Sequence, residues 1–171
     1  MSPKLITAVE IYLIRHGIAQ EREIGLADEV RSLTDKGRNK TRQVAQRLSE
    51  LGVHFDVVLT SPLVRSQQTA KILHDYKLSQ NIAESAYLAP DGSIYDWLDW
   101  LKKQQYPQQT QLALVGHQPN LGQWAEILVW GEDRAKLLLK KAGIIGIALP
   151  ETDSPIGQSQ LFWLTAPKFL L

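Results

Sequence analysis

The sequence predicts an α/β fold, a three-layer sandwich with a mostly parallel central sheet. Short apolar, β-branched runs recur along the chain, and most are followed by a segment whose apolar residues have helical spacing. The 11 Gly and 8 Pro lie between these segments, and no linker or repeat interrupts the pattern. Because strands and helices that alternate through short connections build a parallel sheet with helices on both faces, we expect a single domain over residues 1–171.

The first strand and helix are marked near the start of the chain. Residues 10–14 form an apolar run typical of a strand buried on both faces. Thr34 is a candidate N-cap and Gly52 a stop signal, and the apolar or small residues between them predict a helix. Residues 56–60 are a second apolar run, which predicts a second buried strand.

The middle of the chain repeats this alternation. Ser61 can cap a helix that has Pro62 at its first position and runs to about residue 76. Ser93 precedes a shorter amphipathic helix. Residues 112–116 then predict a third fully buried strand, so the strand-then-helix unit recurs.

The last part of the chain changes character. Pro119 should open a helix that Gly131 closes. Residues 144–149 and 160–165 predict two further strands, which we expect to be antiparallel because only a turn at 152–157 separates them.

Composition narrows the range of functions. The 19 Lys+Arg and 18 Asp+Glu leave a formal charge of +1, which disfavours nucleic acid and membrane surfaces as partners. The absence of cysteine excludes thiolate nucleophiles, cysteine-based zinc sites and disulfide scaffolds. No apolar run is long enough for a membrane span or a secretory signal. We therefore expect a cytoplasmic monomer without a cofactor or a metal.

Basic and imidazole side chains follow the three best strands. Arg15-His16-Gly17 ends the first strand, Arg65 follows the second, and His117 follows the third. Since ligands of such folds bind beyond the carboxyl ends of the strands, these residues should meet at one edge of the sheet. Arginine donors suit phosphate oxygens, a neutral imidazole can attack phosphorus, and Gly17 would let backbone N–H groups approach an anion. The pattern therefore predicts phosphoryl transfer through a phosphohistidine.

Four segments in this order resemble the histidine phosphatase superfamily, which includes the cofactor-dependent phosphoglycerate mutases. The short chain, without large insertions, is most similar to the small SixA-type phosphohistidine phosphatases. The segments are LIRHG at 13–17, which holds the RHG motif, LTDKG at 33–37, SPLVRSQQTA at 61–70 and VGHQP at 115–119.

The resemblance implies a phosphoglycerate mutase-like fold and a metal-independent phosphatase. It makes His16 the nucleophile and Arg15, Arg65 and His117 the clamp on the phosphoryl oxygens, with Gly17 beside them in the substrate site. Fixed cations around the transferred group are the expected source of rate acceleration, because negative charge spreads over its three oxygens in the transition state.

One element of the larger family members is missing. They carry a glutamate two residues after a leucine, which protonates the leaving oxygen, whereas here Leu88 is followed by Ala89 and Pro90. An alkoxide leaving group needs such an acid, but imidazole leaves phosphorus more readily. We therefore expect an open, shallow site for protein phosphohistidine, such as that on a phosphotransfer domain of a signalling relay. Four residues could replace the acid, and the sequence does not choose among them: Glu84, Asp91, Asp28 and Glu29.

Other functions are less favoured. A broad phosphatase for small phosphomonoesters remains an alternative for the same site. A metal-dependent hydrolase could use His16 and His117, but the sequence has no metal-binding motif and the arginines would repel a cation. A protein that only binds phosphoproteins would not need the nucleophile, yet this sequence has both histidines and both arginines.

The remaining polar and aromatic residues have structural interpretations. Ser61, Pro62 and Thr69 are expected at a helix start and in its packing, whereas Ser66 and Gln118 could be structural or could reach a phosphate. Tyr95, Trp97 and Trp100 fit the core and surface of an amphipathic helix, and Lys136, Lys140 and Lys141 fit a solvated helix face. His54 and His74 have no motif context.

Overall fold

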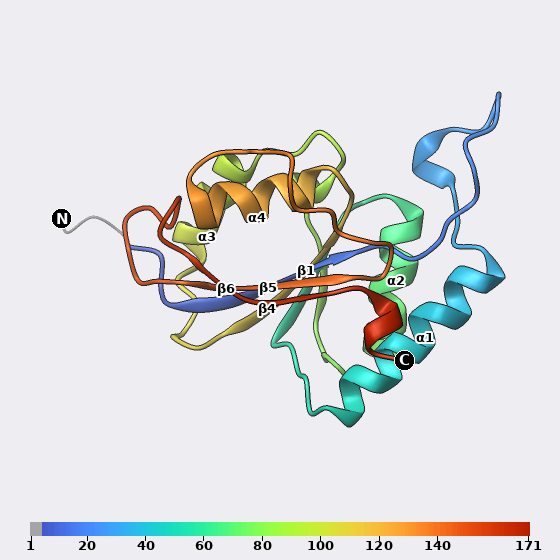
Figure 1. Ribbon diagram of the computed structural model, residues 1–171, viewed down its shortest axis with the longest axis horizontal. Coiled ribbons are helices and arrows are strands. Elements are labelled where there is room, and N and C mark those ends of the chain that lie inside the picture. The colour runs from blue at the N-terminus through green and yellow to red at the C-terminus, as the bar shows by residue number, and fades with distance from the viewer. Residues whose placement is uncertain (1–4) are drawn as a thin grey trace.

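The computed structural model describes residues 5–171, and this part of the chain contains a six-stranded sheet in the order β3-β2-β4-β1-β5-β6 (Figure 1). β1 pairs in parallel with β4, β4 with β2, and β2 with β3, whereas β5 is antiparallel to both β1 and β6. The mostly parallel α/β sheet predicted from the sequence is confirmed. The strands are β1 (Val9–Arg15), β2 (Val57–Thr60), β3 (Ile82–Glu84), β4 (Gln111–Gly116), β5 (Ile144–Leu149) and β6 (Gln160–Thr165).

Helices cover both faces of the sheet, which gives the predicted three layers (Figure 1). Alternate side chains of β1 enter two separate cores, since Ile11 and Leu13 belong to one and Tyr12 and Ile14 to the other. The first core holds the apolar faces of α3 and α4, and the second those of α1 and α2. These helices are α1 (Asp35–Glu50), α2 (Val64–Asp75), α3 (Ile94–Gln104) and α4 (Asn120–Trp130).

Most helix ends follow the predicted signals. The Thr34 side chain accepts a hydrogen bond from the Gly37 N–H at 3.0 Å and caps α1, and Ser93 caps α3 in the same way. Gly131 adopts the left-handed conformation after α4, which a residue without a β-carbon does at little cost. Trp97 is fully buried and Tyr95 is exposed, as expected for an amphipathic α3.

The predicted start of α2 is wrong by two residues. The helix begins at Val64, after an extended Leu63, so Pro62 lies outside it. Ser61 does not cap the helix: its hydroxyl accepts from the N–H of Leu63 at 3.3 Å, before the helix begins, and lies 2.7 Å from Nε2 of His117. A partner distant in sequence thus adds to the local hydrogen bond of this serine.

The segment between α4 and β5 is not helical, contrary to the solvated helix face that we predict for its lysines. A fully buried carboxylate, Glu126 of α4, organises it instead. This carboxylate accepts hydrogen bonds from the backbone N–H groups of Arg134, Lys136 and Leu137. It thereby satisfies donors that would otherwise be left without partners.

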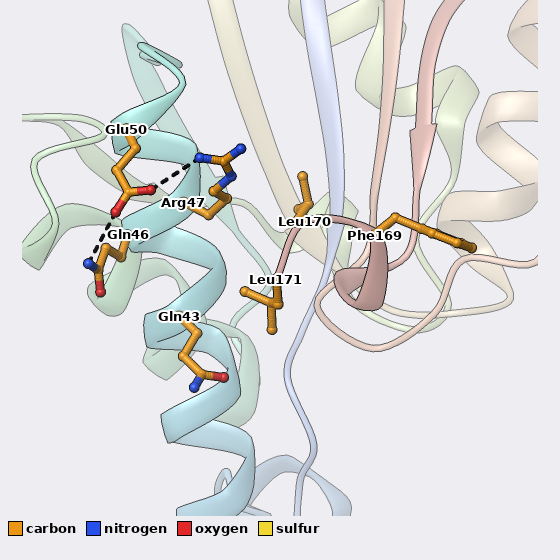
Figure 2. A pocket seen from close by; sticks show the side chains of 7 residues that line it. All are labelled: Gln43, Gln46, Arg47, Glu50, Phe169, Leu170 and Leu171. Atoms are coloured by element: carbon orange, nitrogen blue, oxygen red, sulfur yellow. Dashed lines mark hydrogen bonds and ion pairs between the residues drawn. The ribbon is translucent and has the colours of Figure 1, made fainter.

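The ends of the strands define the functional edge. β1, β2 and β4 run in parallel, so residues that follow them lie at one edge of the sheet, where β5 begins and β6 ends. After β6, the 3-10 helix η3 (Pro167–Phe169) leads to a chain end that lies against α1. Figure 2 shows Leu171 facing α1 beside Gln43. Among the helices of residues 5–171, none combines the length and apolar character needed to cross a membrane.

Replacing Glu126 with Gln should lower the free energy of unfolding by about 2 kcal/mol, because an amide nitrogen faces N–H donors that need acceptors. Burial raises the pKa of Glu126, but the three backbone N–H donors outweigh it and hold the pKa below its usual range. Its stabilisation is therefore present at neutral pH and lost as the pH falls through the folded-state pKa. Urea unfolding measures both effects.

The matched control is Glu132→Gln, which removes an exposed carboxylate from the same segment. We expect it to change stability by less than about 0.5 kcal/mol. Equal losses for the two variants would contradict the role of Glu126.

Candidate active site

Three side chains from three segments meet at the carboxyl edge of the sheet. His16 directly follows β1, His117 directly follows β4, and Arg65 lies in the first turn of α2. The two imidazole rings have their centroids 5.2 Å apart. All three residues are buried, with exposed fractions of 6% for His16, 4% for His117 and 3% for Arg65. The structure thus brings together three of the four residues that the sequence places in the site.

The hydrogen bonds of His16 assign its tautomer. Nδ1 lies 2.7 Å from the carbonyl oxygen of Gly17, which only accepts, so Nδ1 donates and carries the proton. Nε2 lies 3.2 Å from Nε of Arg65, which only donates. The lone pair of Nε2 is therefore held at the guanidinium, in the state that a nucleophile requires.

The tautomer of His117 follows from the same argument. Nη2 of Arg65 lies 3.4 Å from Nδ1 of His117, so this nitrogen accepts. Nε2 then carries the proton and donates to the hydroxyl of Ser61 at 2.7 Å, with the hydroxyl of Ser66 at 3.5 Å. Ser61 and Ser66 therefore orient His117, a role that we did not predict for Ser61.

Burial and nearby positive charge keep both imidazoles neutral. Burial is the main cause that lowers the pKa of His16 to about 3, and the charges of Arg65 and Arg15 add to it against the hydrogen bond to Gly17. Burial also lowers the pKa of His117 to about 4, again with Arg65 contributing. Both rings are therefore neutral at neutral pH, with one proton each.

Gly17 has a different role from the one expected. Its N–H donates to the hydroxyl of Thr69 at 3.1 Å, so it is not free to bind an anion. The same hydroxyl donates to the backbone carbonyl of Arg65 at 2.8 Å, which ties the end of β1 to α2. A β-carbon at Gly17 would lie 2.4 Å from the hydroxyl of Thr41, so only glycine fits here without a shift. Gly17 positions His16 through close packing.

Arg15 lies beside the imidazole pair and points to the segment before β5. Its Nη1 donates to the carbonyl of Leu139 at 3.0 Å, and its Nε is buried without a hydrogen-bond partner among the described residues. Burial lowers the pKa of Arg15, which nevertheless stays charged at neutral pH. The carbonyl of Leu139 lies two residues after Leu137, whose N–H donates to buried Glu126.

Asp28 is the one of the four candidate acids that contacts the residues of the site. Its carboxylate lies 3.1 Å from Nη2 of Arg65, and its backbone carbonyl accepts from Nη1 at 2.8 Å. Glu84 instead accepts from Gln67 at the surface, and Glu29 and Asp91 are exposed.

The charge state of Asp28 does not suit a proton donor. Burial raises its pKa, but the hydrogen bonds and charges of Arg65 and Arg31 outweigh this and lower it overall. Asp28 is a carboxylate at neutral pH and forms ion pairs with Arg65, Arg31 and Arg22. The 3-10 helix η1 (Asp28–Val30) thus reaches Arg65.

Comparison with known proteins identifies the family of this chain. The model of the histidine phosphatase superfamily (branch 1) matches residues 11–90. A protein of Picosynechococcus sp. (strain PCC 7002), itself uncharacterized, is 45% identical over 169 residues, which cover 95% of this chain and 99% of that protein. The chain belongs to the histidine phosphatase superfamily.

Relatives with a described activity either match a smaller part of this chain or are less identical to it than the Picosynechococcus protein. The mitochondrial serine/threonine-protein phosphatase Pgam5 of Drosophila virilis is 36% identical over 99 residues, which cover 53% of this chain but 34% of Pgam5. The chain thus matches about a third of the length of that relative.

Solved structures extend the likeness to nearly the whole chain. The protein histidine phosphatase SixA complexed with tungstate superposes with a TM-score of 0.78 at 25% identity, covering 95% of this chain and 99% of SixA. The alpha-ribazole phosphatase of Shigella flexneri has a TM-score of 0.66 at 17% identity, with 92% and 96% covered, and shares the fold. The phosphoglycerate mutase-like architecture implied by the sequence is confirmed.

The imidazoles of His16 and His117 should stay neutral from pH 8 down to about pH 5 in the anion-free protein, because burial disfavours the charged ring. Nitrogen-15 NMR of the imidazole rings measures the charge state, and His16→Ala and His117→Ala variants assign the signals. Titration of either ring near its ordinary pKa would show that the site is more hydrated than its burial indicates.

Asp28→Asn should tighten the binding of inorganic phosphate about fivefold, since Asn keeps an oxygen for Arg65 but removes a negative charge beside the anion. Calorimetry measures the dissociation constant. Glu29→Gln makes the same charge change at an exposed neighbouring position and should leave the constant nearly unchanged. Weaker phosphate binding to Asp28→Asn than to Glu29→Gln would contradict the competition of Asp28 with the anion.

Proposed function

We propose that this histidine phosphatase transfers a phosphoryl group from its substrate to Nε2 of His16 and then to water. The observation that carries the proposal is the buried, neutral His16 whose unprotonated Nε2 faces Arg65 at 3.2 Å. The lone pair of Nε2 forms the N–P bond as the bond from phosphorus to the leaving group breaks. A water oxygen then attacks phosphorus, the N–P bond breaks, and inorganic phosphate leaves.

The neighbouring residues serve the transferred group. Arg65 and Arg15 supply fixed positive charge for the phosphoryl oxygens, and His117 supplies a further hydrogen-bonding ring. The hydrogen bond from Nδ1 of His16 to the carbonyl of Gly17 favours the cationic ring that forms when Nε2 is phosphorylated. His16 therefore begins neutral and is stabilised as it becomes charged.

We propose protein phosphohistidine as the substrate class, carried by a phosphotransfer domain of a relay in the cytoplasm. Imidazole is a leaving group that needs little acid assistance, and Asp28, the carboxyl group nearest to Arg65, is ionised. The likeness to the protein histidine phosphatase SixA over 95% of the chain supports the same substrate class. The mechanism uses no metal, since the two imidazoles and two guanidiniums supply the nucleophile and the charge.

His16→Ala should abolish turnover of an aryl phosphate, with a loss of about 10³-fold or more, and should prevent formation of an acid-labile phosphoenzyme. Arg65→Ala should lose about 100-fold in kcat, because one fixed donor to the transition-state oxygens is removed. His54→Ala, which removes an exposed imidazole outside the site, is the matched control and should keep full activity. A phosphoenzyme that still forms in His16→Ala would assign the nucleophile elsewhere.

The substrate class is tested with phosphohistidine, phosphoserine and phosphothreonine proteins and a panel of phosphorylated metabolites, each with and without EDTA. We expect the highest kcat/KM for the phosphohistidine protein and no effect of the chelator. Preference for a metabolite by orders of magnitude would favour a small-molecule phosphatase, and preference for phosphoserine or phosphothreonine the activity named for Pgam5. Inactivation by EDTA would contradict the metal-free mechanism.

A further inference from the structure

A basic cavity lies at the edge of the sheet where β1 ends. Its volume is about 430 Å³, and Arg15 forms part of its wall. Four lysines complete the set of cations around it: Lys40, Lys140, Lys141 and Lys168. We call this space the lysine cavity. The sequence predicts a solvated helix face for two of these lysines, and the structure keeps both exposed but places them on a non-helical segment that lines this cavity.

Three separate elements assemble the lysine cavity. Lys40 comes from α1, Lys140 and Lys141 from the segment before β5, and Lys168 from η3 after β6. Leu170, which follows η3, packs against the core to which α1 contributes. The lysines therefore lie at the same edge as His16 because the fold places their elements there.

The positive charge of the lysine cavity is not balanced locally. No Asp or Glu lines it, and within residues 5–171 none of its five cations forms an ion pair with a carboxylate. Arg65 differs in this respect, because it forms an ion pair with Asp28. A concave wall that carries only positive charge concentrates the positive potential and attracts anions.

Arg15 connects the lysine cavity to the phosphoryl site. It precedes His16 directly in the chain, and its buried Nε has no partner among the described residues. Its side chain lines the lysine cavity, and its charge also acts on His16 and His117. A substrate whose phosphoryl group reaches His16 would place its neighbouring atoms against the lysines.

We infer that the lysine cavity is a second anion site, which takes carboxylates of a protein substrate that lie near its phosphorylated side chain. This inference rests on the proposed function. Lysines carry point charges on flexible side chains, and here they line a cavity together with the apolar residues Ile18 and Pro167. That arrangement suits several carboxylates on a protein surface, whereas a single small ligand is usually held by a few fixed polar groups in an enclosed pocket.

The test compares phosphohistidine peptides of one length with acidic, neutral or basic residues around the phosphorylated histidine. The wild-type protein should prefer the acidic peptide to the neutral one by about tenfold in kcat/KM, and the basic peptide should be poorest. The preference should decrease as salt is added, because exposed charges are screened.

The double variant Lys140→Gln/Lys141→Gln should reduce the ratio of kcat/KM for the acidic over the neutral peptide to near one. Lys103→Gln is the matched control, since this exposed lysine of α3 lies outside the cavity, and it should keep the ratio. Loss of the preference in the control as well would overturn the assignment to this cavity.

The two proposals fail in different ways. Wild-type turnover of the peptides without any charge preference would overturn the second anion site and leave the proposed function intact. Preference for a carboxylated aryl phosphate over the plain one, without discrimination among peptides, would overturn the protein source of the anion. If neither the peptides nor an aryl phosphate is hydrolysed, the proposed function itself is wrong.

Discussion

The burial of one permanent cation against two imidazoles is the constraint on which the site depends. Arg65 is 3% exposed and lies within hydrogen-bond distance of both His16 and His117. Burial is the main cause that keeps both rings neutral, and the charge of Arg65 adds to it, so each ring keeps one nitrogen as an acceptor. The carbonyl of Gly17 and the hydroxyl of Ser61 accept hydrogen bonds from the protonated ring nitrogens. The guanidinium thus contributes to the neutrality of both rings and also selects their tautomers.

The first turns of α2 connect the parts of this arrangement. Arg65 reaches both imidazoles, Ser66 approaches His117, and Thr69 joins the N–H of Gly17 to the backbone of α2. Residues four apart lie on one side of a helix, so the cation and the residue that fixes the end of β1 face the same edge. A small rotation of α2 would therefore disturb all these contacts together.

The sequence predicts the sheet and the meeting of distant residues better than it predicts local detail. β1, β2 and β4 are recognisable as apolar runs because most of their side chains are buried, whichever strand pairs with them. Residues that follow parallel strands lie at one edge of the sheet, so their meeting can also be predicted. Ser61 was misplaced because its partner, His117, lies far away in the sequence. The lysines before β5 resemble a helix face, but buried Glu126 binds the backbone there. Asp28 could not be selected among four acids because only the path of η1 decides its contact.

The hold of Asp28 on Arg65 has a consequence for which anions the site selects. In the resting protein this carboxylate already occupies a donor of the guanidinium, so the protein contains its own monovalent ligand. An anion that binds this donor must displace the Asp28 carboxylate. Its apparent binding free energy is therefore its own interaction with Arg65 minus the interaction that Asp28 loses. A carboxylate gains little by this exchange, whereas a doubly charged phosphoryl group gains from its additional charge. We therefore expect this internal carboxylate to make the site select doubly charged phosphoryl groups over singly charged anions.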